Sequence, residues 1–364
     1  MFTGIGKNSP VPSDRSSPVP STSRRPLVFA ACLALLAGSL VAASPATARA
    51  EAPGQAKPGH ETFAVIGDVP YGADQVARFP GWIDQINADP QVGFVFHVGD
   101  IKNGSTRCDD AYYRMIRTQF ERFADPLVYT PGDNEWTDCH RANNGGYDPL
   151  ERLAFDRSVF FDRPGTTLGA PARVSVPDAA YPENVQLRRA GVSFATLHVV
   201  GSNNDLAPWT GLGQTAATPA QVAEERGRMA ASIALLRQTF AQATQRHDRA
   251  VVVLQQADMF DPTYTPAPTD ISAFRPLVQA LAEETNRFRG DVYLVNGDSH
   301  IYNSDRPLAP GSVWLERYGV TSPAPALERI TVDGSDNNKD WLKVTVNRPG
   351  AASTLGWTRV PYSG

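Results

Sequence analysis

Four aspartates in this sequence each follow a short apolar stretch and a glycine. Asp68 ends FAVIGD, Asp100 ends FVFHVGD, Asp133 ends PLVYTPGD and Asp298 ends DVYLVNGD. Each stretch has the length and the Val, Phe and Leu content of a buried β-strand. Ligands of open α/β sheets bind beyond the carboxyl ends of the strands. Four carboxylates gathered there would repel one another unless a cation lay among them, so we expect a cation site at this edge.

A fifth Gly-Asp pair serves as an internal comparison. Gly290-Asp291 precedes its apolar stretch instead of following it, so it should lie at the opposite edge of the sheet. One Gly-Asp pair is usually an ordinary turn. Four such pairs, all placed after apolar stretches, favour a functional arrangement.

The rest of the chain alternates between strand-like and helix-like segments, which predicts an α/β fold. Strands are expected at residues 62–66, 92–98, 127–130, 193–200, 250–254 and 292–295, and helices at 73–88, 109–123, 219–246 and 274–287. The longest helix begins with a capping box formed by Thr218 and Gln221. Residues 132–189 are loop-like, with weak helical patches near 149–161, and should build a binding site or lid. Late strands at 327–332 and 341–346 are expected to form a hairpin.

The first 50 residues have the features of an export signal. Arg24 and Arg25 precede the apolar run 26–43, and Ala48-Arg49-Ala50 forms a small-residue cleavage site. We expect export to the cell envelope or the medium with cleavage after Ala50, by the twin-arginine route or an ordinary secretory signal. Residues 51–60 would be a linker and residues 61–364 a single domain. We expect no permanent membrane anchor, because the apolar run is short.

Charge and cysteine content narrow the possible partners and the compartment. The 364-residue chain has 34 Lys and Arg against 38 Asp and Glu, a formal net charge of −4, with no run of basic residues. This argues against nucleic acid or an anionic membrane as a partner. Cys108 and Cys139 are the two cysteines beyond residue 50, and in an exported protein they could form a disulfide or remain free thiols. The sequence leaves the oligomeric state open.

The strand-end motifs resemble those of the calcineurin-like metallophosphoesterase superfamily, which includes the purple acid phosphatases. The resemblance covers residues 63–302, with motifs in the expected order: GDVPY at 67–71, GDIK at 99–102, GDNE at 132–135, QQ at 255–256 and GDSH at 297–300. It implies a four-layer α/β/β/α sandwich of two mixed sheets flanked by helices. It also implies a site that holds two divalent cations.

Carrying the family's metal ligands onto the matching positions gives two sites. The first would be formed by Asp68, Asp100 and His300, and the second by Asp100, Asp133, Gln255 and Asp298. The second set departs from the family, because its usual histidines and asparagine are replaced by other oxygen ligands. Oxygen ligands favour Mg²⁺, Mn²⁺ or Ca²⁺ there, whereas the site with His300 could also take Zn²⁺ or Fe.

The resemblance implies hydrolysis of a phosphorylated small molecule by a metal-activated water. Asn134 stands where the family has a proton-donating histidine, and it can only form hydrogen bonds. His140 and Lys102 are the candidates nearest in sequence to donate the proton instead. Tyr71 and Asn204, with Lys102, are candidate substrate ligands. Either the enzyme acts on a phosphomonoester, phosphodiester or nucleotide, or the chain is a weak or inactive binding protein on the same scaffold.

Overall fold

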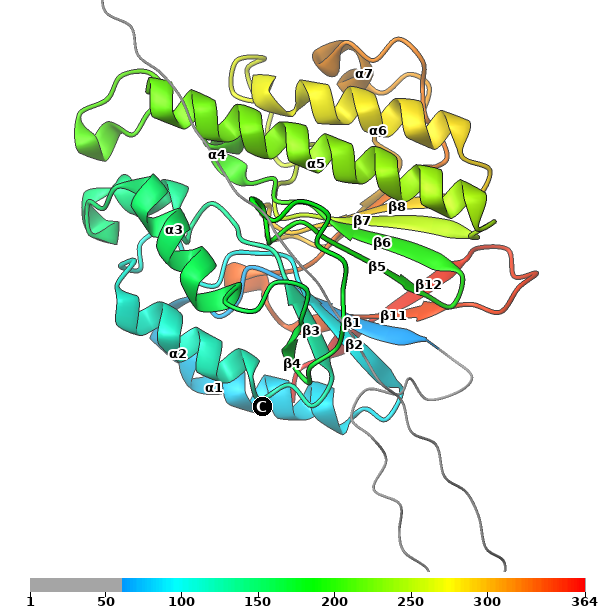
Figure 1. Ribbon diagram of the computed structural model, residues 1–364, viewed down its shortest axis with the longest axis horizontal. Helices are drawn as coiled ribbons and strands as arrows, with labels where there is room; N and C mark the ends of the chain where they lie inside the picture. The colour runs from blue at the N-terminus through cyan, green and yellow to red at the C-terminus, as the bar shows by residue number, and fades with distance from the viewer. Residues whose placement is uncertain (1–60, 364) are drawn as a thin grey trace, which may run out of the picture. The chain divides into compact units, whose positions relative to one another are not determined.

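Two six-stranded sheets packed face to face form the centre of the structure, which is a computed structural model describing residues 61–363 (Figure 1). The first sheet has the strand order β12-β11-β1-β2-β3-β4 and the second β5-β6-β7-β8-β10-β9. Strands β1, β2 and β3 run parallel, as do β6, β7, β8 and β10, and the outer strands pair antiparallel. Both sheets are therefore mixed.

The strands occupy the segments expected from the sequence, with additional strands at 168–169, 185–189, 303–305 and 355–361. Those of the first sheet are β1 (Thr62–Ile66), β2 (Val92–His97), β3 (Pro126–Tyr129), β4 (Leu168–Gly169), β11 (Asp340–Val346) and β12 (Leu355–Pro361). Those of the second sheet are β5 (Val185–Arg189), β6 (Val192–Thr196), β7 (Ala250–Leu254), β8 (Asp291–Asn296), β9 (Asn303–Asp305) and β10 (Leu327–Thr331).

Helices cover the outer face of each sheet, so the four-layer arrangement is confirmed (Figure 1). The principal helices are α1 (Gly72–Ala88) and α2 (Asp110–Phe120) over the first sheet and α5 (Pro219–Gln245) and α6 (Arg275–Arg287) over the second. The others are α3 (Pro149–Phe160), α4 (Gly201–Asn204) and α7 (Val313–Tyr318), with 3₁₀ turns η1 (Thr137–His140), η2 (Ala142–Asn144), η3 (Thr210–Leu212), η4 (Ser272–Phe274) and η5 (Ser335–Asn337). The expected capping box of Thr218 and Gln221 is present at the start of α5.

Alternating side chains along the central strands fill two hydrophobic layers at once. In β1, Phe63 and Val65 pack between the sheets, whereas Ala64 and Ile66 pack under the helices. Successive side chains of a strand point to opposite faces, so a strand that is buried on both faces is apolar throughout. Burial on both sides holds the strand ends, and the turns that follow them, in fixed positions.

The two late strands do not form the expected hairpin. β10 pairs with β8 and β9 in the second sheet, whereas β11 lies in the first sheet between β1 and β12. The hairpin partner of β11 is β12, at 355–361, which we did not expect. Neighbouring segments thus belong to different sheets, a choice that depends on long-range packing and not on local pattern.

The remaining expectations concern the export signal, the linker and a membrane anchor. The export signal at 1–50 and the linker at 51–60 lie outside the described residues and stay predictions. Within residues 61–363, none of the helices combines the length and the apolar character of a membrane-spanning segment.

Candidate metal centre

The strand-end aspartates converge on one another and on His300. Ligand atoms of Asp68, Asp100 and His300 lie within 4.8 Å of one another, and so do those of Asp100, Asp133 and Asp298. Asp100 belongs to both groups. The aspartates and the histidine of the two predicted sites thus form two clusters that share Asp100, and either cluster could hold a cation.

The backbone takes left-handed conformations at several of the clustered residues. Asp68, Asp100 and Asp298 have φ angles of 53°, 59° and 74°, and His300 has a φ of 63°. These left-handed conformations are uncommon for residues other than glycine, although aspartate tolerates them better than most. Such conformations cluster at functional sites.

The glycines of the motifs make room for carboxylates on neighbouring strands. A Cβ at Gly132 would lie 2.1 Å from Oδ1 of Asp100, and a Cβ at Gly297 would lie 2.3 Å from Oδ2 of Asp68. Neither distance is possible for a real side chain. The glycine of one Gly-Asp pair therefore leaves space for the aspartate side chain of another pair, so these pairs pack against one another.

Tyr71 and Asn134 hold the shared carboxylate. The Tyr71 hydroxyl donates to Asp100 Oδ2 (2.9 Å), and the Asn134 Nδ2 donates to the same oxygen (2.8 Å). Asn134 Nδ2 also reaches the Tyr71 oxygen at 2.8 Å, and its backbone amide donates to Asp100 Oδ1 at 3.1 Å. Tyr71 Oη lies 3.4 Å from Nε2 of His300. Both predicted residues therefore lie inside the centre.

The centre concentrates negative charge in a buried place. Burial raises the pKa of Asp100 well above its usual value, and the charges of Asp133, Glu135, Asp68 and Asp298 raise it further. Burial and neighbouring carboxylates also raise the pKa of Asp298. For His300, burial lowers the pKa, but the hydrogen bond and charge of Asp68 outweigh it and the pKa rises. A bound cation would offset this repulsion.

The prediction for Gln255 is corrected by the structure. Nε2 of Gln255 donates to the Ala257 carbonyl at 2.9 Å, and within residues 61–363 no hydrogen bond joins Gln255 to the clustered carboxylates. Gln256 instead lies among the carboxylates, where its Nε2 donates to Asp100 Oδ2 (3.2 Å) and to Asp133 Oδ1 (3.1 Å). Consecutive residues at the end of a strand point to opposite faces, so a difference of one position reverses the assignment.

Asn204 does not face a substrate, so this prediction is also corrected. Its side chain is fully buried, with Oδ1 accepting from Arg228 at 2.5 Å and Nδ2 donating to Glu225 at 3.1 Å. Arg228 also donates to the Asn204 carbonyl at 3.0 Å. These bonds hold the 201–205 turn against α5.

Lys102 and His140 each form a hydrogen bond with a backbone group. Lys102 is fully buried and donates from Nζ to the Asn103 carbonyl (3.1 Å). Burial lowers its pKa to about 8, although Glu135 and Asp100 act in the opposite direction. His140 accepts from the Gly211 amide through Nδ1 (3.1 Å), and burial lowers its pKa. Their predicted roles with the substrate stay predictions.

Ser202 and Arg141 lie around the carboxylates of Asp133 and Asp138. Ser202 donates to Asp133 Oδ2 at 2.9 Å and lies 3.1 Å from Asp138 Oδ1. Asp138 in turn binds Arg141 at 2.6 Å. Ser202 was not singled out from the sequence, although it lies in the polar run 201–205 that follows β6. The position of Arg141 beside Asp138 depends on the fold of the 132–147 loop.

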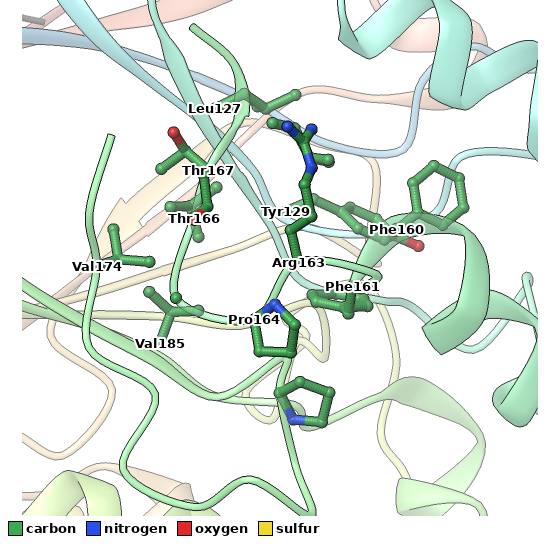
Figure 2. A pocket seen from close by; sticks show the side chains of 14 residues that line it. Leu127, Tyr129, Phe160, Phe161, Arg163, Pro164, Thr166, Thr167, Val174 and Val185 are labelled. Atoms are coloured by element: carbon green, nitrogen blue, oxygen red, sulfur yellow. The ribbon is translucent and has the colours of Figure 1, made fainter. Parts of the chain in front are cut away.

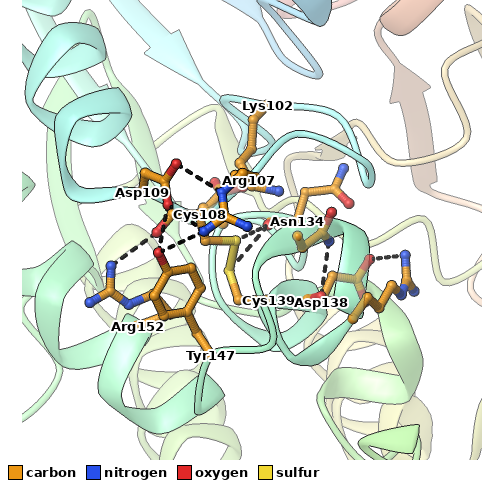
Figure 3. Close-up of a disulfide and its surroundings, with 12 residues drawn as sticks. Lys102, Arg107, Cys108, Asp109, Asn134, Asp138, Cys139, Tyr147 and Arg152 are labelled. Atoms are coloured by element: carbon orange, nitrogen blue, oxygen red, sulfur yellow. Dashed lines mark hydrogen bonds and ion pairs between the residues drawn. A yellow bond between two sulfur atoms is a disulfide. The ribbon is translucent and has the colours of Figure 1, made fainter. Parts of the chain in front are cut away.

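A disulfide fastens the loop that carries Asn134. Cys108 and Cys139 are bonded, with Cα atoms 5.8 Å apart, and their sulfurs lie 3.7 and 3.8 Å from the Asn134 carbonyl oxygen (Figure 3). The bond joins the segment before α2 to η1. The disulfide alternative is thus the one present in the structure.

A small cavity near the first sheet is separate from the metal centre. It has a volume of about 30 Å³ and lies beside β3 and the end of α3, with mainly apolar walls that include Leu127, Phe160 and Val185 (Figure 2). None of the clustered aspartates lines it. This volume suits a single water molecule and no substrate.

Part of the chain matches a known protein family. Residues 61–189 match the family model described as calcineurin-like phosphoesterase. No curated protein matched the chain.

Solved structures were also found that are similar to this chain at low sequence identity. The GAP50 anchor of the Plasmodium inner membrane complex has 10% identity and a TM-score of 0.42, over 84% of this chain and 90% of that one. A purple acid phosphatase from yellow lupin has 13% identity and a TM-score of 0.40, over 85% of this chain and 52% of that one. A 5'-nucleotidase precursor from Thermus thermophilus has 12% identity and a TM-score of 0.39, over 83% of this chain and 54% of that one. This chain thus spans about half the length of the last two.

The family model covers the first three strand-end motifs, and the fold brings them together with Asp298 and His300. Residues 61–189, the part of the chain that matches, are thus similar to the calcineurin-like phosphoesterase family.

Proposed function

We propose that this protein hydrolyses a phosphoester with a water activated by two divalent cations. The observation that supports this most directly is the membership of Asp100 in both ligand clusters. Two cations held there would neutralise phosphoryl oxygens and lower the pKa of a bound water. The cluster of Asp100, Asp133 and Asp298 offers only oxygen ligands, which favours Mg²⁺, Mn²⁺ or Ca²⁺, and His300 makes the other cluster suited to Zn²⁺ or Fe as well.

Arg141 is the side chain best placed to bind a phosphoryl oxygen. Its side chain is 43% exposed, and Asp138 holds Nη1 at 2.6 Å. A Cβ placed on Gly104 would lie 3.2 Å from this Nη1 and 3.1 Å from Oδ1 of Asn134, so both groups border the same space. A guanidinium forms strong, directional hydrogen bonds with phosphate. Arg141→Gln should therefore lower kcat/KM for a phosphoester about tenfold.

Asn134 limits the substrates that such a centre can use. Its amide donates to Tyr71 and Asp100 and cannot supply a proton to a leaving oxygen. Esters whose leaving group needs little protonation, such as aryl phosphates, should therefore react best. Alkyl phosphates would need a proton from another group, for which His140 remains a candidate.

We also propose that the protein is exported, with residues 1–50 as the cleaved signal. The Cys108–Cys139 disulfide supports this, because disulfides persist mainly in oxidising compartments. Detection of a mature N-terminus at Glu51 in the envelope or medium would test it.

The test of the enzymatic proposal measures cation content and phosphate release together. The purified protein is analysed for bound metal and then assayed with an aryl phosphate monoester and a diester, with Mg²⁺, Mn²⁺, Ca²⁺ or Zn²⁺ added. Asp100→Asn should lower both cation content and turnover, whereas Asp84→Asn, which changes an exposed carboxylate paired with Arg122, should change neither.

The outcome separates the enzyme from its alternative, a binding protein on the same scaffold. Both predict bound cation, and only the enzyme predicts phosphate release. Unchanged cation content and turnover in Asp100→Asn would contradict the proposal.

A further inference from the structure

Positive charge gathers at the end of the second sheet opposite the metal centre. A surface pocket of about 550 Å³ lies there, where β5 ends, β6 begins and α5 ends. Four arginines are among the residues that line it, Arg173, Arg188, Arg189 and Arg246, and its walls include no acidic residue. In a chain of net negative charge, such a concentration calls for an explanation.

Only one of the four arginines is neutralised by a carboxylate among the described residues. Arg188 binds the buried Asp248 at 2.6 Å. The guanidinium of Arg189 lies over the ring of Phe94, 5.7 Å from its centre. Within residues 61–363, no ion pair involves Arg173, Arg189 or Arg246. Three positive charges therefore line one concave space with no carboxylate partner in the part of the chain that the structure describes.

A second basic pocket adjoins the first through Asp248. It has a volume of about 510 Å³, and its basic lining residues are His247, Arg249, Arg287 and Arg289. Its two carboxylates already have partners: Asp248 binds Arg188 and Ser193, and Asp291 accepts from the Thr354 amide. The basic surface therefore extends beyond the first pocket.

We propose that the pocket of Arg173, Arg188, Arg189 and Arg246 binds an organic phosphate with two or more negative charges. Guanidinium groups match phosphate oxygens in charge and in geometry. The volume lies in the range of small-molecule sites. Several unpaired arginines around one space favour a ligand with more than one charge. The ligand is either a free organic phosphate or the phosphorylated head group of a lipid.

The test uses inorganic tripolyphosphate as the probe and keeps the metal centre empty with EDTA. Without cations, the carboxylates of the centre repel an anion, so the measurement does not depend on the phosphoesterase proposal. By calorimetry at low salt, the unmodified protein should bind the probe saturably. The double variant Arg173→Gln/Arg246→Gln should bind it at least tenfold more weakly, with an unchanged melting temperature.

The matched control removes the same charge elsewhere. Arg226→Gln/Arg237→Gln changes two arginines of α5 that lie outside the pocket and should leave binding intact. Equal loss in both double variants would show non-specific attraction and would overturn the proposal, as would the absence of saturable binding.

Vesicle sedimentation distinguishes the two ligand sources. Phosphatidylcholine vesicles with and without a phosphoinositide are mixed with the protein in EDTA. Tripolyphosphate binding without sedimentation assigns a free organic phosphate. Sedimentation only with the phosphoinositide, lost in Arg173→Gln/Arg246→Gln, assigns a lipid head group.

Discussion

Nε2 of Gln256 donates a hydrogen bond to Oδ2 of Asp100 across 3.2 Å, which places an amide beside the carboxylate shared by both ligand clusters. Its Oε1 accepts from the Gly201 amide at 2.7 Å, and this bond fixes the orientation of the side chain. Gln256 thus reduces the repulsion between Asp100 and Asp133 without adding a charge. The adjacent Gln255 makes no such contact.

This difference predicts opposite results for two neighbouring substitutions. Gln256→Ala removes both hydrogen bonds to the carboxylates, so cation affinity should fall about tenfold, as is usual for groups that orient metal ligands. Gln255→Ala should lower the free energy of unfolding and leave cation affinity within twofold. Calorimetric titration with Mn²⁺, beside urea denaturation, measures both quantities. A larger loss of affinity in the Gln255 variant would restore the original assignment.

The close approach of Gly132 to Asp100 predicts a large effect of one methyl group. In Gly132→Ala, the new Cβ would lie 2.1 Å from Oδ1 of Asp100, so the loop or the carboxylate must move. Cation affinity and phosphate release should both fall at least tenfold.

Gly81 provides the matched glycine control, because it lies exposed within α1 and no atom lies within 4 Å of a Cβ built there. Gly81→Ala should stabilise the protein by about 0.5–1 kcal/mol, since alanine loses less backbone freedom than glycine in a helix. Its metal binding should not change. Normal turnover in Gly132→Ala would show that Asp100 is less constrained than the structure indicates.

The disulfide should contribute to both stability and the position of Asn134. Replacing Cys108 and Cys139 by serine should lower the free energy of unfolding by about 2–4 kcal/mol, the usual range for a bond of this kind. Because both sulfurs contact the Asn134 carbonyl, kcat should fall as well. Thermal melting with and without dithiothreitol measures the first effect. The reductant should lower the melting temperature of the unmodified protein and leave that of the double variant unchanged.

Two buried histidines predict a loss of stability in mild acid. Burial lowers the pKa of His198 to about 4 despite its hydrogen bond to Glu183, and burial likewise lowers that of His97 to about 4. Between the ordinary histidine pKa of about 6.5 and a pH of about 4, the unfolded chain therefore binds more protons than the folded one. Stability should fall as the pH falls through this window, by about 3 kcal/mol for each histidine.

Urea denaturation from pH 7 to pH 4 measures this loss. His198→Gln should remove about half of the decrease, because His97 still titrates. His247→Gln, which changes an exposed histidine, should leave the decrease unchanged. An equal decrease in all three proteins would assign the acid sensitivity to carboxylates instead.

Most of the α/β architecture was predictable, because strands buried on both faces are continuously apolar and amphipathic helices repeat every three to four residues. The expected β1, β2, β3, β7 and β8 and the helices α1, α2, α5 and α6 all occur close to their expected positions. The late strands were assigned to the wrong pairing. Local pattern identifies a strand, but its partner is chosen by packing across a long sequence separation.

For the site, the amino-acid sequence by itself determined which carboxylates and which histidine lie at strand ends, because Gly-Asp after an apolar run is a local signal. Only the tertiary structure decided that Gln256 and not Gln255 faces the centre, and that Asn204 supports α5. Only the tertiary structure placed Arg141 beside Asn134 and gathered Arg173, Arg189 and Arg246 around one pocket. The direction of a side chain depends on where its strand ends, and charges distant in sequence meet only when the chain has folded.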